Sequence, residues 1–153
     1  MKIKYNERII MKDGIEAYFF KSLIYVSKAE DNVDYDEILN ILTHSWKYNH
    51  NSYISGMLLC DNRHFMQIIQ GPILTIDKLY ERIQNDARHK DIQCIGEELL
   101  HERDCSGWGI GFYDDQEAAN IFYESLGIGH GKALYDLGYE DAKSLLLILK
   151  NII

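Results

Sequence analysis

The order in which strand-like and helix-like segments follow one another restricts the fold of this chain more than any other sequence feature. Runs of β-branched and aromatic residues predict strands, and apolar residues three and four apart predict helices. The order is strand, helix, strand, strand, helix, strand, strand, with strands expected at residues 22–27, 53–60, 64–70, 92–100 and 108–113. We therefore expect a ferredoxin-like α+β fold: a five-stranded mixed sheet with two helices on one face.

Local signals place the two helices between these strands. Asp34 followed by Glu37 is a capping box, in which two side chains satisfy backbone N–H groups at a helix start. The apolar stripe that follows ends at the polar residues 49–52. Pro72 suits the first turn of the second helix, because the N–H groups of that turn are unpaired in any case. We expect this helix to end near residues 86–89.

Helical patterns continue beyond the last strand. Asp114 with Glu117 is a second capping box before residues 118–126, and residues 139–153 hold a leucine-rich helical pattern. Since the first two helices cover only one face of the sheet, we expect these C-terminal helices to pack on the other.

The N-terminal segment carries a turn signal of its own. Asp13 and Gly14 lie between two strand-like runs, 3–11 and 16–20, so an additional hairpin is predicted there. The expected division of the chain is an N-terminal extension, a central domain and a helical C-terminal extension, at residues 1–20, 21–113 and 114–153.

Composition and charge exclude several classes of protein. A formal net charge of -8 argues against direct binding to nucleic acid or to an anionic membrane surface. No apolar run approaches the roughly 20 residues that span a bilayer, and the N-terminus lacks the apolar core of a signal peptide, so we expect a cytoplasmic protein. The three cysteines and six histidines have no metal-ligand spacing, which predicts neither a disulfide framework nor a metal site.

Gln67 is a polar residue within the apolar strand expected at 64–70. Because side chains alternate along a strand, its amide shares a face with Phe65 and Ile69. Burying that amide without a partner costs about 1–3 kcal/mol, so it needs a hydrogen bond. Tyr25 lies in the first strand, which neighbours the third in a ferredoxin-like sheet, so phenol and amide can meet. The simpler alternative is that both are ordinary core residues with local partners.

The remaining candidates near this pair also have ordinary explanations. Asn49 stands where the first helix is expected to end, and a helix cap is the simpler interpretation from its residue type. Ile54 and Ile83 would provide flat apolar walls for a planar ligand, although such stripes more often form plain core. The residues alone therefore predict a buried polar pair without assigning it a function.

Five short segments occur in one collinear register over about residues 21–113. They are LIYVS at 23–27, NHNSYISGML at 49–58, FMQIIQG at 65–71, IQNDARH at 83–89 and GWGIGF at 107–112. Together they closely resemble the BLUF (blue light using flavin) family, whose strand order is the one predicted above. The resemblance implies a short stand-alone photoreceptor that holds a flavin noncovalently, with FAD as the usual cofactor and FMN as the alternative.

The resemblance also implies roles for individual residues. Tyr25 matches the photoactive tyrosine, which gives an electron and a proton to the excited flavin. Gln67 matches the glutamine whose hydrogen bonding to the flavin then changes, and Asn49 matches the asparagine at the same ring edge. Other flavin-lining positions of the family match Ile54, Arg88 and His89. By residue type alone, however, Arg88 is equally a solvated charge at a helix end and His89 a surface or stacking residue.

The last strand departs from the family pattern at one position. Trp108 matches the usual tryptophan, but Ile110 stands where methionine is common. A β-branched side chain is stiffer than methionine, so we expect flavin binding to persist while the relay of the signal through Trp108 and Ile110 differs.

The resemblance implies a sensor without catalytic residues, whose output is a changed contact with an unidentified protein partner or within a homo-oligomer. Three alternatives use the same fold: an acylphosphatase-like hydrolase, a flavin-dependent enzyme, or a light-blind interaction module. Fold similarity alone does not separate them.

Overall fold

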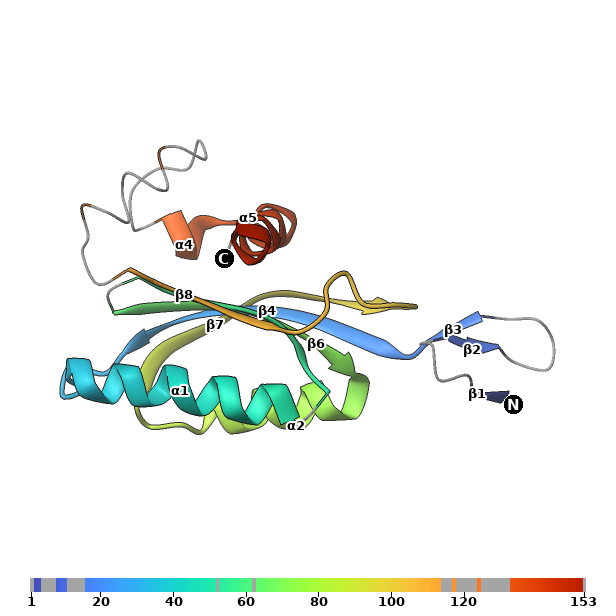
Figure 1. Ribbon diagram of the computed structural model, residues 1–153, viewed down its shortest axis with the longest axis horizontal. Coiled ribbons are helices and arrows are strands. Elements are labelled where there is room, and N and C mark those ends of the chain that lie inside the picture. The colour runs from blue at the N-terminus through green and yellow to red at the C-terminus, as the bar shows by residue number, and fades with distance from the viewer. Residues whose placement is uncertain are drawn as a thin grey trace.

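Five strands form the central sheet, in the order β7-β4-β6-β5-β8 (Figure 1). The computed structural model describes residues 2–3, 8–10, 16–51, 53–61, 63–113, 117, 124 and 133–152. The strands are β4 (Phe20–Ala29), β5 (Ser55–Asp61), β6 (His64–Pro72), β7 (His89–Leu100) and β8 (Trp108–Tyr113). All neighbours pair antiparallel except β5 and β8, which are parallel. The predicted ferredoxin-like α+β fold with a mixed sheet is therefore confirmed.

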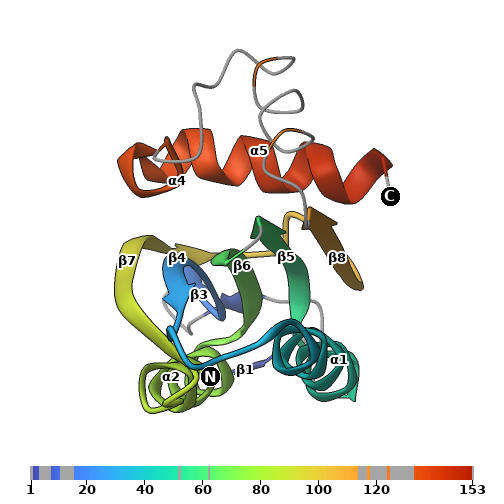
Figure 2. The ribbon, with the colours of Figure 1, turned by 90° about the vertical axis from the view of Figure 1, so that its left-hand side faces the viewer.

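Helices cover both faces of this sheet (Figure 2). The first face carries α1 (Tyr35–Asn51) and α2 (Ile73–Gln84), and the opposite face carries α4 (Ala133–Asp136) and α5 (Tyr139–Ile152). The start of α1 is capped as predicted, because Asp34 Oδ1 accepts a 2.9 Å hydrogen bond from the backbone N–H of Glu37. Pro72 occupies the N-cap position of α2.

Strand alternation gives the sheet an apolar surface on each side. Toward α5, the fully buried Ile24, Met57 and Ile68 contact Leu146 and Leu149. Toward α1 and α2, two further clusters fill the space between helices and sheet. One of them contains Tyr25, and the other contains Phe65. The sheet thus separates two cores.

Several boundaries differ from those predicted, among them the end of α2 and the start of β7. Helix α2 ends at Gln84 instead of near residues 86–89, and Asn85 caps it with its N–H bonded to the carbonyl of Glu81. Strand β7 begins at His89, three residues before the predicted start at 92, because His89 pairs with Ala29 at the end of β4. Pairing with a long neighbouring strand thus extends β7 beyond its own apolar run.

The N-terminal strands form a second, three-stranded sheet that projects beyond the start of β4 (Figure 1). The predicted hairpin corresponds to β2 (Arg8–Ile10) and β3 (Glu16–Tyr18), and β1 (Lys2–Ile3) adds a third strand. The Asp13-Gly14 turn lies outside the described residues. The predicted helix at 118–126 also lies outside them, apart from position 124.

The C-terminal helical pattern is confirmed by α5. Among the described residues, no helix has the length and apolar character needed to cross a membrane. The same residues contain no group of three or more His, Cys, Asp or Glu side chains placed to bind a metal ion.

Candidate functional site

The phenol of Tyr25 and the amide of Gln67 meet on the sheet face covered by α1 and α2. The two residues are direct partners in the antiparallel pairing of β4 with β6. Tyr25 Oη donates a 2.5 Å hydrogen bond to Gln67 Oε1, and the two side chains are only 5% and 2% exposed. The sequence prediction that this pair lies together on that face is confirmed.

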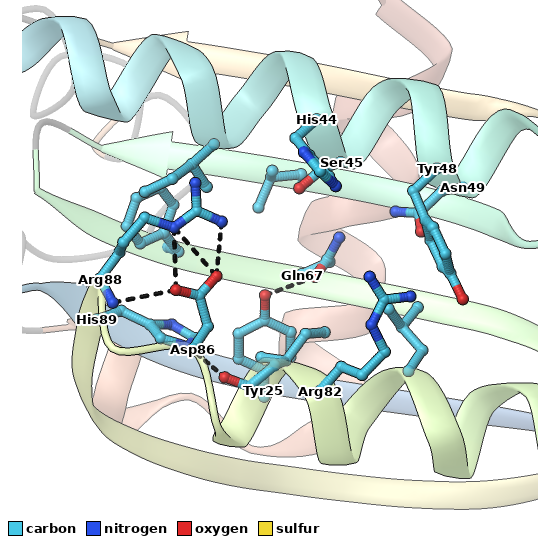
Figure 3. A pocket seen from close by; sticks show the side chains of 15 residues that line it. Tyr25, His44, Ser45, Tyr48, Asn49, Gln67, Arg82, Asp86, Arg88 and His89 are labelled. Carbon is cyan, nitrogen blue, oxygen red and sulfur yellow. Dashed lines mark hydrogen bonds and ion pairs between the residues drawn. The ribbon is translucent and has the colours of Figure 1, made fainter.

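A cavity of about 130 Å³ opens beside this pair, between α1 and α2 (Figure 3). Its lining comes from both helices, from the loop after α2, and from the sheet. The lining residues are Tyr25, Ile41, His44, Ser45, Tyr48, Asn49, Leu58, Phe65, Gln67, Leu79, Arg82, Ile83, Asp86, Arg88 and His89.

Burial further stabilises the neutral form of Tyr25, which a phenol already adopts at neutral pH. Burial raises the pKa of this phenol well above its ordinary value of 10, and the neighbouring Tyr80 and Asp86 raise it further. Tyr25 therefore keeps its proton at neutral pH. That proton points to Gln67 Oε1, which is an acceptor.

Asn49 presents an unused acceptor to the cavity. It lies within the last turn of α1, which continues to Asn51, so it is not the residue that caps the helix. Its side chain is 2% exposed, and Oδ1 has no hydrogen-bond partner among the described residues. An orphaned buried acceptor costs about 1–3 kcal/mol, so this atom is a candidate to accept a hydrogen bond from a bound ligand.

Charged side chains lie along the rim of the cavity (Figure 3). Arg88 donates to the carboxylate of Asp86 at 2.7 Å, and its Nη1 lies 3.7 Å from Glu37 on α1. The Arg88 guanidinium holds the pKa of Asp86 below its ordinary value. Arg82 on α2 stacks over the ring of Tyr48 on α1, 4.2 Å from its centre. At the mouth of the cavity, Arg82 thus links α2 to α1, and Arg88 links the loop after α2 to α1.

His89 is held in one orientation at the sheet side of the cavity. Its Nε2 lies 2.5 Å from the carbonyl oxygen of Ile83, and its Nδ1 lies 2.9 Å from Ser27 Oγ. A carbonyl only accepts, so Nε2 carries the proton in the neutral ring and Nδ1 accepts from Ser27. The ring meets Tyr25 edge to face, at 6.4 Å between centres.

Ile54, Trp108 and Ile110 lie outside the cavity lining. Ile54 is buried in the cluster that contains Tyr25, and Trp108 packs against that cluster from β8. Ile110 packs with Leu58 in the neighbouring cluster.

Gly56 makes room for the indole of Trp108. A Cβ at position 56 would lie 2.9 Å from Trp108 Cζ3 and 1.9 Å from the carbonyl oxygen of Ile68. The positive φ of 153° at Gly56 also favours glycine. Trp108 is therefore fitted closely against β5, while its buried Nε1 has no partner among the described residues.

A comparison with protein-family models matches residues 20–111 to the family described as BLUF, sensors of blue-light using FAD. The chain belongs to the BLUF family. The curated relatives include photoactivated adenylate cyclase subunit alpha of Euglena gracilis, 30% identical over 82 residues, which are 54% of this chain and 8% of that protein. The chain thus spans only about a tenth of the length of the cyclase subunits that it matches.

Solved BLUF structures agree with this assignment. BlrB, described as a BLUF protein in its dark state, is 29% identical with a TM-score of 0.58, over 71% of this chain and 84% of that one. BlrP1 of Klebsiella pneumoniae, solved with FMN and cyclic diGMP, is 26% identical with a TM-score of 0.53, over 62% of this chain and 25% of that one. As a member of this family, the chain contains a blue-light sensor domain that binds flavin.

The residues present fit a flavin in the BLUF pocket. Asn49 Oδ1 offers an acceptor to a ring that carries an imide N–H. Apolar side chains, among them Ile83 and Leu79, line the walls. The guanidinium groups of Arg82 and Arg88 at the rim suit phosphate groups, which arginine binds through paired donors.

Sequence reasoning missed several residues that line the BLUF pocket. Arg82, Asp86 and Tyr48 became candidates only when α1 and α2 were seen to face each other. An arginine in the last turn of a helix is ordinary in any protein, because it interacts favourably with the helix dipole. Its sequence position therefore gave no signal of a role at the pocket.

Proposed function

We propose that this chain is a photoreceptor in which blue light drives electron and proton transfer from Tyr25 to bound flavin and rearranges the hydrogen bonding of Gln67. The single observation that supports this most strongly is the 2.5 Å hydrogen bond from Tyr25 Oη to Gln67 Oε1 beside the cavity. When bound, the flavin supplies light absorption and, in its excited state, an acceptor for one electron.

Tyr25 is suited to the donor role because it is neutral, oxidisable and buried. Losing an electron makes a phenol strongly acidic, so its O–H proton leaves with the electron. Its hydrogen bond to Gln67 gives that proton a direction of departure. A bound flavin would take up both the proton and the electron. The transfer requires no external reductant, since the phenol recovers both when the electron returns.

Gln67 is suited to the switching role because an amide can present either a donor or an acceptor at one position. In the structure its Oε1 faces the Tyr25 hydroxyl. A hydroxyl can also accept a hydrogen bond, so a rearranged amide still finds a partner there. Two arrangements of similar energy, in a site with little water, make a two-state element.

We propose that Asn49, Arg88 and His89 bind the flavin together with Tyr25 and Gln67. Asn49 Oδ1 would accept from the ring, and Arg88 would turn from Asp86 toward the ring or its tail. His89, held by Ser27 and Ile83, would keep its orientation beside Tyr25. Ile54 would act indirectly, by packing against Tyr25 in the cluster behind the cavity.

We propose residues 21–113 as the sensor and residues 114–153 as the output segment. Trp108 and Ile110 on β8 would relay the change in Gln67, and the output would be an altered contact with a cytoplasmic protein partner or another copy of the chain. The net charge of -8 favours a protein partner over nucleic acid or an anionic membrane.

The test is the absorption spectrum of the purified protein, supplied with FAD, before and after blue light. We expect a flavin spectrum that shifts slightly to the red on illumination and returns in darkness. A colourless protein, or one whose flavin only bleaches, would contradict the proposal. Steady turnover of NAD(P)H in the light or dark would instead favour a flavin enzyme.

A further inference from the structure

A closed ring of six hydrogen-bonded side chains joins α5 to the sheet face opposite the flavin pocket. In order round the ring, its members are Ser22, Gln70, Asp104, Lys143, Glu98 and Tyr139. Gln70 Nε2 donates to Ser22 Oγ at 3.1 Å and to Asp104 Oδ2 at 2.8 Å. Lys143 Nζ lies 2.8 Å from Asp104 Oδ2 and 2.6 Å from Glu98 Oε1.

Tyr139 closes the ring. Its Oη lies 2.9 Å from Glu98 Oε1 and 2.9 Å from Ser22 Oγ. A phenol has one proton, so Tyr139 donates to the carboxylate and accepts from the Ser22 hydroxyl. The aromatic side chain of Tyr139 lies against the backbone of β7, where a Cβ on Gly96 would be 3.0 Å from it. Tyr139 and Lys143, one turn apart on α5, therefore both bond to the sheet.

The ring shares two strands with the photoactive pair. Ser22 and Gln70 are direct partners on β4 and β6, three positions from the partners Tyr25 and Gln67. Because side chains alternate, the two pairs lie on opposite faces of the same two strands. Ser22 and Gln70 are completely buried. A change in the spacing of β4 and β6 at one pair therefore acts directly on the other.

The two glutamines of β6 differ in one respect. Gln70 Oε1 accepts from the backbone N–H of Asp104 at 2.9 Å while its Nε2 donates to the carboxylate of the same residue. Turning this amide over would place its N–H groups against the backbone N–H of Asp104 and its oxygen against the Asp104 carboxylate. The orientation of the Gln70 amide is therefore locked. Gln67 faces a hydroxyl, which tolerates both orientations. Gln67 can switch, whereas Gln70 moves only with its strand.

Asp104 connects the ring to the segment that precedes β8. It lies in the connection between β7 and β8, four residues before Trp108. The ring thus joins three strands, β4, β6 and β7, to the segment that leads into β8 and to the start of α5.

We propose that Gln70 is the positioning residue that carries the state of the Tyr25–Gln67 pair through the sheet to α5. This inference rests on the proposed function. Rearrangement of Gln67 alters the spacing of β4 and β6, the locked amide of Gln70 follows, and the ring's bonds to Lys143 and Tyr139 lengthen. Helix α5 then loses polar contacts that fix it on the sheet, while its leucines remain buried.

Hydrogen exchange of the α5 backbone amides, measured in darkness and under continuous blue light, tests the relay alongside the flavin spectrum. In the unaltered protein we expect exchange in α5 to rise at least about fivefold in the light, the lower range for coupling between two sites. Gln70→Leu should keep the reversible red shift but lose the light-dependent difference. A purely structural role would raise exchange equally in light and dark and leave their ratio unchanged.

Substitutions in α5 keep the test decisive even if Gln70→Leu does not fold. Lys143→Met should also lose the light–dark ratio, Lys143→Arg should retain most of it, and Glu140→Gln, on an exposed part of α5, should behave as the unaltered protein. The relay is overturned if Gln70→Leu and Lys143→Met both keep the light–dark ratio of α5 exchange. If Gln70→Leu does not fold, an unchanged ratio in Lys143→Met is enough to overturn it. A normal red shift without any light response in α5 also overturns it. If no variant, including the unaltered chain, gives a red shift, the proposed function itself fails.

Discussion

Tyr25 on β4 and Gln67 on β6 are opposite partners in the sheet, and the phenol of the first donates a 2.5 Å hydrogen bond to the amide oxygen of the second. Backbone pairing fixes the distance between the two Cα atoms, so this contact does not depend on a flexible loop. The photochemical pair is thus built into the centre of the sheet, where the strands are best supported.

Tyr25→Phe should bind flavin and stay yellow but lose the reversible red shift. A phenyl ring has no hydroxyl proton to give and is much harder to oxidise than a phenol. Gln67 Oε1 loses its partner, so the free energy of unfolding should also fall by about 1 kcal/mol. Absorption spectroscopy and denaturant unfolding measure the two effects. Tyr80→Phe is the matched control, since that ring lies 6.0 Å from Tyr25 and should leave the shift intact. A reversible shift in Tyr25→Phe would remove Tyr25 from the donor role.

Gln67→Leu should likewise bind flavin and show no red shift, because leucine makes no hydrogen bonds that could rearrange at the edge of the flavin ring. Its light-induced exchange in α5 should be absent as well. The exposed Gln84→Leu, on α2, serves as the control and should keep both responses. Normal light responses in Gln67→Leu would exclude the amide from the mechanism.

Asn49→Ala should raise the dissociation constant for flavin about tenfold, which corresponds to the loss of one buried hydrogen bond worth about 1.4 kcal/mol. Quenching of flavin fluorescence during titration gives the constant. Asn40→Ala changes an exposed asparagine on the same helix and should have no effect on it. Equal affinities for the two variants would mean that Asn49 Oδ1 has no contact with the flavin.

Ile110→Met should keep flavin binding and the red shift while enlarging the light-induced change in Trp108 fluorescence. Methionine is unbranched and adopts more rotamers than isoleucine, so the neighbouring indole gains freedom to move. The measurement is made in a Trp46→Phe background, where Trp108 is the only tryptophan of the chain. An identical fluorescence response with isoleucine and methionine would show that position 110 does not control the relay.

His64→Gln should reduce the pH dependence of stability. Burial lowers the pKa of His64 from its ordinary 6.5, although the neighbouring Asp61 opposes the shift. As the pH falls below about 6.5, the unfolded chain takes up a proton that the folded chain does not, so the free energy of unfolding decreases until the folded pKa is reached. Urea unfolding at about pH 7 and about pH 5.5 should therefore differ less for the variant than for the unaltered protein. Equal differences would show that His64 does not titrate in this way.

The sequence predicted the elements that local chemistry controls. The capping box at Asp34 set the start of α1, and apolar periodicity located α5. Alternation along β6 placed Gln67 on the same face as Phe65. These properties depend on a few neighbouring residues and on the fixed periods of helix and strand, so they can be read from the chain itself.

Only the tertiary structure decided the register at which Tyr25 and Gln67 meet, and which other distant groups come together. That Tyr25 faces Gln67 in register, that Arg82 reaches across to Tyr48, and that Gln70 bonds to Asp104 all depend on the pairing of strands and the packing of helices far apart in sequence. Many partners could satisfy each of these polar groups locally. The sheet register selects one of them, because a shift by a single residue would turn every side chain of β6 to the other face.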